Sequence, residues 1–311
     1  MAVALVTGAR GFLGRHVCQE LTKRGIDAFA ISRSAEGADA RSIAISATPT
    51  IAELVQILDR VEPSMVFHLA GATNADPIAD LYQANVVLGV QLMEAALRRS
   101  VRPTMVLVGS AAEYGRPVRD DGMVRETDPC APENAYGISK LSQTLHGLVA
   151  FRRGLPVVAA RLFNPIGVGA PSTNLLTRVL RQLASAHPGG GLLTTGPLTA
   201  IRDFIDVSDA ARALVDLAHM PRACGQIVNL CTGIGTTVQC LVDQLVATAA
   251  LPITHEIDLR LKGTSDLDMV IGDPERHRAL GLLIPPPDLD RVLGAMLAAA
   301  LKEKLTRGDD T

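Results

Sequence analysis

Aromatic residues are scarce in this chain of 311 residues, which contains no tryptophan, three tyrosines and six phenylalanines. Proteins that hold single-stranded nucleic acid stack its bases on aromatic side chains, so this composition argues against such a role. The formal net charge of −2 also lacks the basic excess that nucleic acids and anionic membrane surfaces attract. We therefore expect neither a nucleic-acid partner nor a membrane partner.

Cysteines are few and show no paired spacing. There are five of them, an odd number without a CxxC pair, which argues against a disulfide framework and a zinc ribbon. No apolar run approaches the roughly 20 residues of a membrane-spanning helix, and the N-terminal residues lack the basic and apolar regions of a signal peptide. These absences predict a protein of the reducing cytoplasm without a metal centre.

The chain does contain a regular alternation of two patterns. Apolar, strand-like runs occupy residues 3–6, 28–32, 65–70, 104–109 and 157–162, and apolar residues at helical spacing lie between them. Continuous apolar strands that alternate with helices are typical of a parallel sheet covered on both faces. The sequence therefore predicts an α/β fold with a doubly wound, Rossmann-type parallel sheet.

The segment Gly8-Ala9-Arg10-Gly11-Phe12-Leu13-Gly14 lies directly between the first strand-like run and a helical pattern. Glycines at such a turn let the backbone approach a ligand, and the N-terminus of the following helix attracts a pyrophosphate. A tight turn without a ligand is the alternative interpretation. The flanking patterns favour a dinucleotide cofactor site. Its predicted contacts are Gly8, Arg10, Gly11, Phe12, Leu13 and Gly14.

The pattern changes after Asn164, where prolines and glycines become frequent. We expect a smaller C-terminal substrate-binding domain, formed by about 165–200 and 231–311. Residues 201–230 again contain strand-like and helical runs, so they are assigned with 1–164 to the dinucleotide-binding domain. A last helix is predicted over 289–305, followed by a charged tail that we expect to fray.

A second motif, Tyr136-Gly137-Ile138-Ser139-Lys140, places a tyrosine and a lysine four residues apart on one helix face. A tyrosine with a pKa of about 10 exchanges protons poorly at neutral pH, and a nearby cation would favour its anion. Ser110 ends a strand-like run, at the edge where open parallel sheets bind ligands. We interpret Ser110, Tyr136 and Lys140 as catalytic residues, against the alternative of an incidental tyrosine and a solvated lysine.

In this order the motifs resemble the extended short-chain dehydrogenase/reductases of the NAD(P)-dependent epimerase/dehydratase family, which act on nucleotide sugars. The resemblance also covers 66–71, Asn85, 109–115, 161–164 and 202–207, while 196–204 and 228–233 are similar to the family's GDP-4-keto-6-deoxy-mannose reductases. It implies further cofactor contacts at Leu69, Ala70, Gly71, Tyr136, Lys140 and Leu162. It implies substrate contacts at Ala111, Ala112, Asn164, Arg202 and Lys262.

The end of the second strand-like run bears on the choice of cofactor. Ser32 and Arg33 stand where an acidic residue would hold the ribose 2′-hydroxyl of NAD. A guanidinium and a small hydroxyl suit a 2′-phosphate instead, because arginine offers two parallel donors to it. We therefore favour NADP(H), with NAD(H) as the alternative. If Arg33 contacts no cofactor, it is a solvated loop cation.

Dehydratases of the resembling family carry an acidic residue two positions before the tyrosine of the YG element, and Ala112 stands there. Glu113 is displaced by one place, and alternation along a strand end predicts that it points away from Ser110 as a solvated turn carboxylate. His68 lies inside a strand-like run and is interpreted as structural. The resemblance thus favours reduction or epimerisation over dehydration.

The expected activity is NADPH-dependent reduction of the 4-keto group of a nucleotide-linked 4-keto-6-deoxy sugar, with a GDP-linked sugar favoured. A 4-epimerase is the alternative, a 4,6-dehydratase fits less well, and a nucleotide-binding regulator without turnover is a third class. Two segments, 167–170 and 262–266, depart from the family's sequence pattern. Both lie in the predicted substrate-binding part, so the sequence does not identify the nucleotide base or the sugar of the substrate. The family also implies a homodimer through helices over 85–97 and 136–151.

Overall fold

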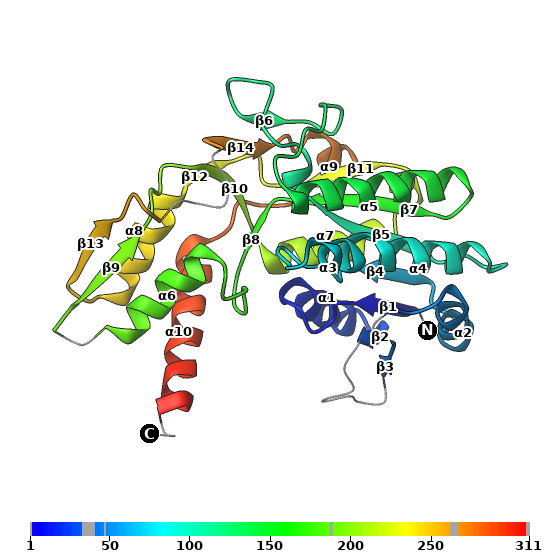
Figure 1. Cartoon of the computed structure of the whole chain (residues 1–311), viewed down its shortest axis with the longest axis horizontal. Helices are drawn as coiled ribbons and strands as arrows, with labels where there is room; N and C mark the ends of the chain where they lie inside the picture. The colour runs from blue at the N-terminus through cyan, green and yellow to red at the C-terminus, as the bar shows by residue number, and fades with distance from the viewer. Residues whose placement is uncertain (1, 33–40, 47, 187–188, 262–266, 309–311) are drawn as a thin grey trace.

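The computed structural model describes residues 2–32, 41–46, 48–186, 189–261 and 267–308. Its centre is a sheet of seven parallel strands (Figure 1). From edge to edge these are β3 (Ser42–Ala44), β2 (Asp27–Ser32), β1 (Val3–Thr7), β4 (Met65–His68), β5 (Thr104–Ser110), β7 (Val157–Leu162) and β11 (Ile227–Leu230). The direction of winding reverses between β1 and β4, which confirms the doubly wound fold and marks the edge where such sheets bind ligands.

Helices cover both faces of this sheet. On one face α1 (Phe12–Lys23) packs against α7 (Val207–Ala218), and on the other lie α2 (Ile51–Val61), α4 (Leu88–Leu97) and α5 (Ala135–Arg152). Along β5, Val106 and Val108 belong to the first core, and Met105 and Leu107 to the second. Successive strand side chains point to opposite faces, so two apolar cores require an unbroken apolar run.

The helix before α4 contains a wide turn. α3 (Ile78–Tyr82) continues through the π-helical turn η1 (Gln83–Val87) into α4. Asn85 in this turn is buried; its amide accepts from the backbone N of Ala72 at 2.7 Å and donates to Ser139 Oγ on α5 at 2.9 Å. Asn85 therefore ties the segment after β4 to α5.

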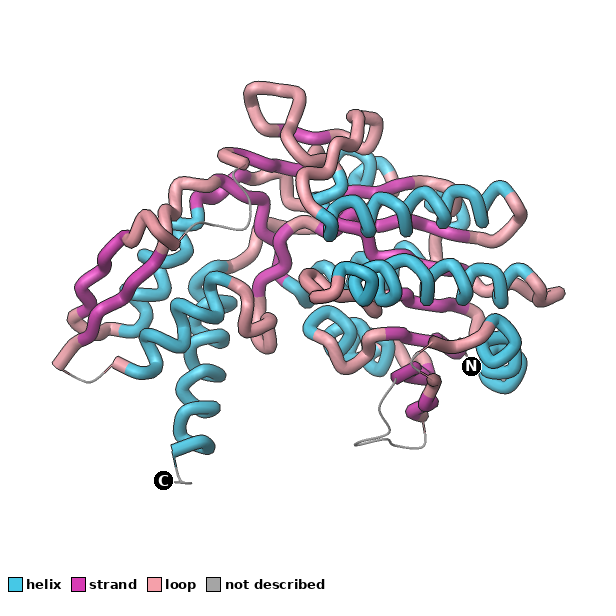
Figure 2. The backbone as a smooth tube through the Cα atoms, in the orientation of Figure 1, coloured by secondary structure: helices cyan, strands magenta, loops and turns pink. Residues whose placement is uncertain are grey.

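A second group of elements lies to one side of the seven-stranded sheet, at the left in Figures 1 and 2. It has its own apolar core beneath three helices, α6 (Leu175–Ser185), α8 (Val238–Ala249) and α10 (Leu289–Gly308). The parallel strands β9 (Gly191–Thr195) and β13 (Ile253–Ile257) belong to it. A further sheet consists of β12 (Gly235–Thr237), β10 (Ile201–Asp206), β14 (Met269–Gly272) and β6 (Met123–Val124), with β8 (Asn164–Ile166) paired to β10.

The chain crosses between these two parts repeatedly. α7 and β11 return to the seven-stranded sheet, and α9 (Glu275–Ala279) packs against β11. In contrast, β10 pairs with β8, β12 and β14, so the first strand of the segment 201–230 lies outside the seven-stranded sheet. The short helices η2 (Ala111–Glu113) and η3 (Pro221–Ala223) complete the fold, and the domain boundaries stay a prediction. Among the described residues, no helix is both long enough and apolar enough to span a membrane.

Candidate active site

The glycine turn joins β1 to α1 at the carboxyl edge of the sheet. Gly8 has a φ of 69°, which glycine adopts without strain, and a Cβ there would lie 2.7 Å from the backbone N of Ala70. Arg10 and Gly11 are exposed, and α1 starts after Gly11 without a side chain to cap its first N–H groups. This helix N-terminus is therefore suited to a pyrophosphate.

Thr7, the last residue of β1, holds the backbone that leaves β4. Its hydroxyl oxygen accepts from the backbone N atoms of Leu69 at 3.2 Å and Ala70 at 3.1 Å, and it lies 2.9 Å from Nδ1 of His68. Burial lowers the pKa of His68 to about 3, so the ring is neutral and accepts the hydroxyl proton at Nδ1. His68 thus lies in the core as a structural residue, in agreement with its sequence context.

The structure brings Ser110, Tyr136 and Lys140 to one edge of the sheet. Ser110 ends β5, and its side chain lies close enough to Tyr136, in the first turn of α5, to act on the pKa of the tyrosine. One turn further along α5, Lys140 Nζ donates to the carbonyl oxygen of Val108 at 2.9 Å and to Gln143 Oε1 at 3.2 Å. The spacing of four residues therefore places both α5 side chains against the end of β5, as the sequence predicts.

The electrostatics of the three residues differ from the sequence-based expectation. Burial raises the pKa of Tyr136, although the hydrogen bond from Ser110 acts in the opposite direction. Burial also lowers the pKa of Lys140 to about 8. The expected lowering of the tyrosine pKa by the Lys140 cation is therefore wrong for this state, and Tyr136 carries its proton at neutral pH.

Glu113 is not the solvated turn carboxylate that alternation predicts. It is fully buried, and its Oε1 accepts from the backbone N of Ser110 at 2.9 Å and from Thr144 Oγ1 at 3.1 Å. Its Oε2 accepts from Arg161 Nε at 2.8 Å. The prediction failed because β5 ends at Ser110 and the 3₁₀ turn η2 follows, so strand alternation no longer applies at Glu113.

Arg161 is a residue that motif reading missed. It lies on β7 with only 2% of its surface exposed, and its guanidinium packs 4.4 Å from the ring centre of Tyr114. Tyr114 in turn donates to Asn229 Oδ1 on β11 at 2.6 Å. A cation inside the apolar strand VVAARL is the signal that could have found this network, because a buried charge requires a partner.

The predicted substrate contacts lie on neighbouring elements. Ala111 and Ala112 form η2, directly after Ser110, and Asn164 on β8 is paired with Phe204 on β10. The Asn164 amide donates to the carbonyl oxygen of Asp203 at 2.8 Å. The guanidinium of Arg202 donates to the carbonyl oxygens of Ile201 and Leu267, and burial lowers its pKa. Two predicted residues, Arg33 and Lys262, lie outside the described residues.

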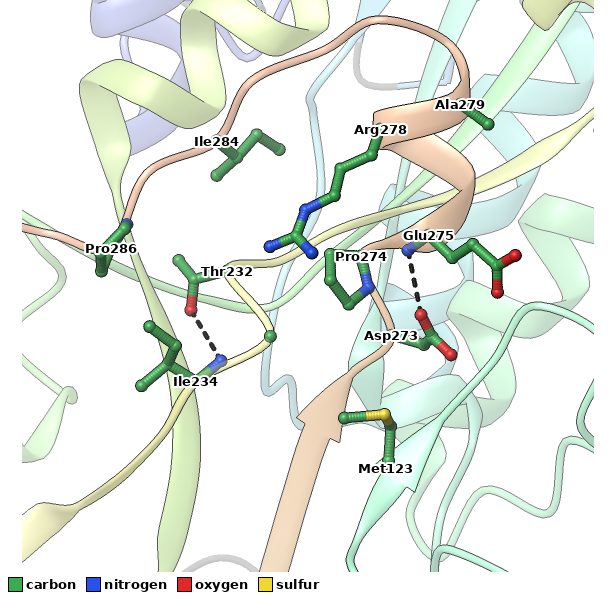
Figure 3. A pocket seen from close by; sticks show the side chains of 11 residues that line it. Met123, Thr232, Ile234, Asp273, Pro274, Glu275, Arg278, Ala279, Ile284 and Pro286 are labelled. Atoms are coloured by element: carbon green, nitrogen blue, oxygen red, sulfur yellow. Dashed lines mark hydrogen bonds between the residues drawn. The ribbon is translucent and has the colours of Figure 1, made fainter.

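Two cavities of similar volume lie away from Ser110. One of about 610 Å³ is lined by Met123, residues 232–234 and residues between 273 and 286, and Arg278 extends into it from α9 (Figure 3). The other, of about 600 Å³, lies against the loop 167–170, α6 and α10. Of the predicted site residues that the structure describes, none lines either cavity. The candidate catalytic residues therefore lie at the sheet edge, apart from the lining of both cavities.

Comparison with known proteins gives a consistent set of relatives. The sequence profile of the NAD dependent epimerase/dehydratase family matches residues 4–231. The chain is 35% identical over 254 residues to dTDP-6-deoxy-L-talose 4-dehydrogenase (NAD(P)(+)) from Kitasatospora kifunensis, across 79% of each chain. It is 33% identical over 330 residues to UDP-glucose 4-epimerase from Azospirillum brasilense, across 96% of this chain and 91% of that one. Identity to GDP-6-deoxy-D-mannose reductase from Pseudomonas aeruginosa is 29% over 199 residues, across 61% and 65%.

Solved structures share the fold over nearly the whole chain. RMD from Pseudomonas aeruginosa, complexed with NADPH, superposes with a TM-score of 0.83 at 24% identity, across 97% of this chain and 98% of that one. MoeE5 in complex with UDP-glucose and NAD superposes with a TM-score of 0.80 at 26% identity, across 100% of both. One neighbour thus holds NADPH and the other holds NAD.

Proposed function

Because the chain belongs to the NAD dependent epimerase/dehydratase family, we propose that it reduces the 4-keto group of a nucleotide-linked 4-keto-6-deoxy sugar with NADPH. In this reaction C4 gains a hydride and its oxygen gains a proton, which gives a 4-hydroxy sugar. Two relatives support the substrate class, since their names specify 6-deoxy sugars linked to dTDP and to GDP. The similarity at 196–204 favours the GDP-linked form.

The position of Ser110 beside Tyr136, at the carboxyl end of β5, carries this proposal. Two hydroxyl groups at this edge of the sheet can both bind a carbonyl oxygen placed between them. Tyr136 keeps its proton at neutral pH, so it is ready to donate it to that oxygen, while Ser110 holds the oxygen in place. Lys140, one turn along α5, binds the nicotinamide ribose and adds positive charge as the tyrosine loses its proton.

The residues at the sheet edge fit a dinucleotide. The uncapped N-terminus of α1 would hold its pyrophosphate, beside Gly8 to Gly14 and the backbone of 69–71. Leu162 ends β7 opposite Ser110, where it would contact the nicotinamide, and Ser32 ends β2, where it would contact the adenosine ribose. NADPH, when bound, supplies the hydride. The proposed contacts on the substrate are Ala111, Ala112, Asn164, Arg202 and Lys262.

The residues after Ser110 support reduction over dehydration. Elimination of water needs an acid close to the sugar, and Ala112 stands at the position where the family's dehydratases carry it. The neighbouring carboxylate, Glu113, is buried against Arg161. A 4-epimerase remains the second candidate, because the relative from Azospirillum aligns with 96% of this chain. The two activities differ in whether cofactor is consumed.

Incubation with GDP-, dTDP- and UDP-linked 4-keto-6-deoxy sugars and NADPH tests the proposal. We expect loss of NADPH absorbance in proportion to the 4-hydroxy product, with the product identified by NMR. UDP-glucose with catalytic NAD is the matched arm for the epimerase. Interconversion of UDP-glucose and UDP-galactose without cofactor consumption, and no reduction of any keto sugar, would overturn the proposal in favour of the epimerase.

A further inference from the structure

One oxygen atom joins the end of β5 to α5. Glu113 Oε1 accepts from the backbone N of Ser110 at 2.9 Å and from the hydroxyl of Thr144 at 3.1 Å. Thr144 lies one helical turn beyond Lys140. The carboxylate reaches this position because residue 109 is glycine: a Cβ there would lie 2.2 Å from Oε1. The strand that carries Ser110 and the helix that carries Tyr136 therefore share Glu113.

We propose that Glu113 is a positioning residue that holds the Ser110 hydroxyl against Tyr136. This inference rests on the proposed function for its catalytic readout, while its geometric part concerns the chain alone. The Ser110 side chain also accepts from the backbone N of Ala112 at 3.2 Å, so the carboxylate and the serine hydroxyl close a capping box around η2. This arrangement leaves the serine oxygen few orientations.

The carboxylate needs a buried counter-charge to stay in place. Arg161 Nε donates to Glu113 Oε2 at 2.8 Å, and both residues are almost fully buried. A second contact fixes the guanidinium, whose Nη2 donates to Cys130 Sγ at 3.0 Å. Loss of either charge alone would leave the other desolvated and unpaired, which is far more costly than loss of both.

Glu113 also affects the pKa values of the neighbouring residues on α5. Its negative charge acts to raise the pKa of Tyr136 and that of Lys140. The charged and titratable groups that face it are Arg161 from β7, Tyr136 and Lys140 from α5, and Cys130 from the segment before α5. Removal of the Glu113 charge should therefore lower the pKa of Tyr136.

The test uses the charge-neutral double variant Glu113→Gln/Arg161→Met, because Glu113→Gln alone would leave the buried Arg161 without a counter-charge. We expect kcat for the keto sugar to fall on the order of 10–100-fold with KM and NADPH affinity little changed, since misplacement of a reacting group has effects of this size. The variant Thr144→Val, which removes one hydroxyl and keeps both charges, should give a smaller loss of kcat. Glu126→Gln is the control, because Glu126 is a buried carboxylate that binds the Asn229 backbone and Arg276.

A second readout needs no substrate. The chain has three tyrosines and no tryptophan, so tyrosinate absorbance during a pH titration is the sum of only three groups. The Tyr136 component, identified as the part lost in Tyr136→Phe, should shift to lower pH in the double variant and stay in place in Glu126→Gln. An unshifted Tyr136 titration together with wild-type kcat overturns the positioning role. A chain that reduces no keto sugar but shows the shift overturns the proposed function and supports the contact of Glu113 with the Ser110–Tyr136 pair.

Discussion

The carboxylate of Asp203 accepts two hydrogen bonds from Thr232, from the backbone N at 2.9 Å and from the hydroxyl at 2.7 Å. Its other oxygen accepts from the backbone N of Gly233 at 2.8 Å and Gly272 at 3.3 Å. Asp203 lies on β10, and its fully buried side chain thus holds the loop after β11 and the end of β14. One carboxylate connects the seven-stranded sheet to the β10 sheet.

Asp203→Asn should destabilise the protein by about 1–3 kcal/mol, because the amide NH₂ would face backbone donors that lose their acceptor. Urea unfolding of the two proteins measures the difference. Asp258→Asn is the matched control, since Asp258 pairs with the exposed Arg260 and its replacement should leave stability nearly unchanged. Equal losses for both variants would contradict the central place given to Asp203.

Tyr136→Phe removes the proton donor and should lower turnover by about 10²–10⁴-fold. NADPH and substrate affinities should change little, because the ring still packs at the start of α5. Single-turnover kinetics and cofactor fluorescence titration measure the two effects. Tyr82→Phe makes the same change on α3 and should have no effect. Near-full activity of Tyr136→Phe on every 4-keto sugar would show that another group donates the proton.

Lys140→Met should lower turnover and also weaken NADPH binding, since Lys140 is proposed to bind the nicotinamide ribose. The same fluorescence titration measures this second loss, which distinguishes it from Tyr136→Phe. The variant also removes a buried amine whose pKa is lowered to about 8. Unchanged NADPH affinity would remove the ribose contact from the proposal.

NADPH should bind more tightly than NADH, and Arg33→Ala should weaken NADPH by about 1.5–3 kcal/mol, the range of a hydrogen bond to a charged group. NADH should be nearly unaffected, because it lacks the 2′-phosphate. Calorimetric titration of both cofactors measures the change, with Arg60→Ala on the exposed side of α2 as a control. Equal dissociation constants for the two cofactors in the unaltered protein would refute this prediction.

His68 should make stability fall with acid. Its pKa is about 3 in the folded protein against an ordinary value of 6.5, so the unfolded chain takes up the proton first. Stability contributed by the neutral ring is complete above pH 6.5 and is lost as pH falls toward 3, by about 1.4 kcal/mol per pH unit. His68→Asn keeps an acceptor for Thr7 and should show a shallower slope between about pH 6.5 and 5. Parallel slopes in urea unfolding would contradict the assignment.

We also predict a homodimer through α5. Ile138, Leu145 and Val149 lie on one face of this helix and expose 45%, 52% and 42% of their surfaces. A stripe of exposed apolar side chains is typical of an interface, and two-fold dimers are the commonest assembly. Leu145→Glu should therefore give a monomer in light scattering, while Val101→Glu in the loop before β5 should not. A monomeric mass for the unaltered protein would refute the prediction.

The sequence predicts most of the sheet because strands that are buried on both faces contain consecutive apolar residues. Residues 105–108 and 157–160 are continuous apolar runs, and they lie in β5 and β7, each of which has a neighbouring strand on both sides. The pairing of β10 could not be predicted in this way, since its sequence, IRDFID, does not indicate which strands lie beside it. An apolar composition indicates that a strand is buried. Which strands lie beside it in the sheet depends on contacts with residues that are distant in the sequence.

The candidate site was predicted where a motif fixes local geometry. The spacing of Tyr136 and Lys140 is enough to place both on one helix face. Glu113 was misread because its orientation depends on where β5 ends, and that end depends on the capping box with Ser110. The partner of Glu113 lies 48 residues away on β7, beyond the reach of local pattern.

The π turn at 83–87 amounts to one extra residue held within a helix. A chain shortened by one residue here could form an ordinary α-helix, and its backbone would lose no hydrogen bond. Each residue turns an α-helix by about 100°, so Asn85 would then point away from Ala72 and Ser139. The segment after β4 would lose its link to α5, and the Ala72 backbone would lose its two hydrogen bonds to Asn85. Deletion of a single residue from this helix should therefore be poorly tolerated.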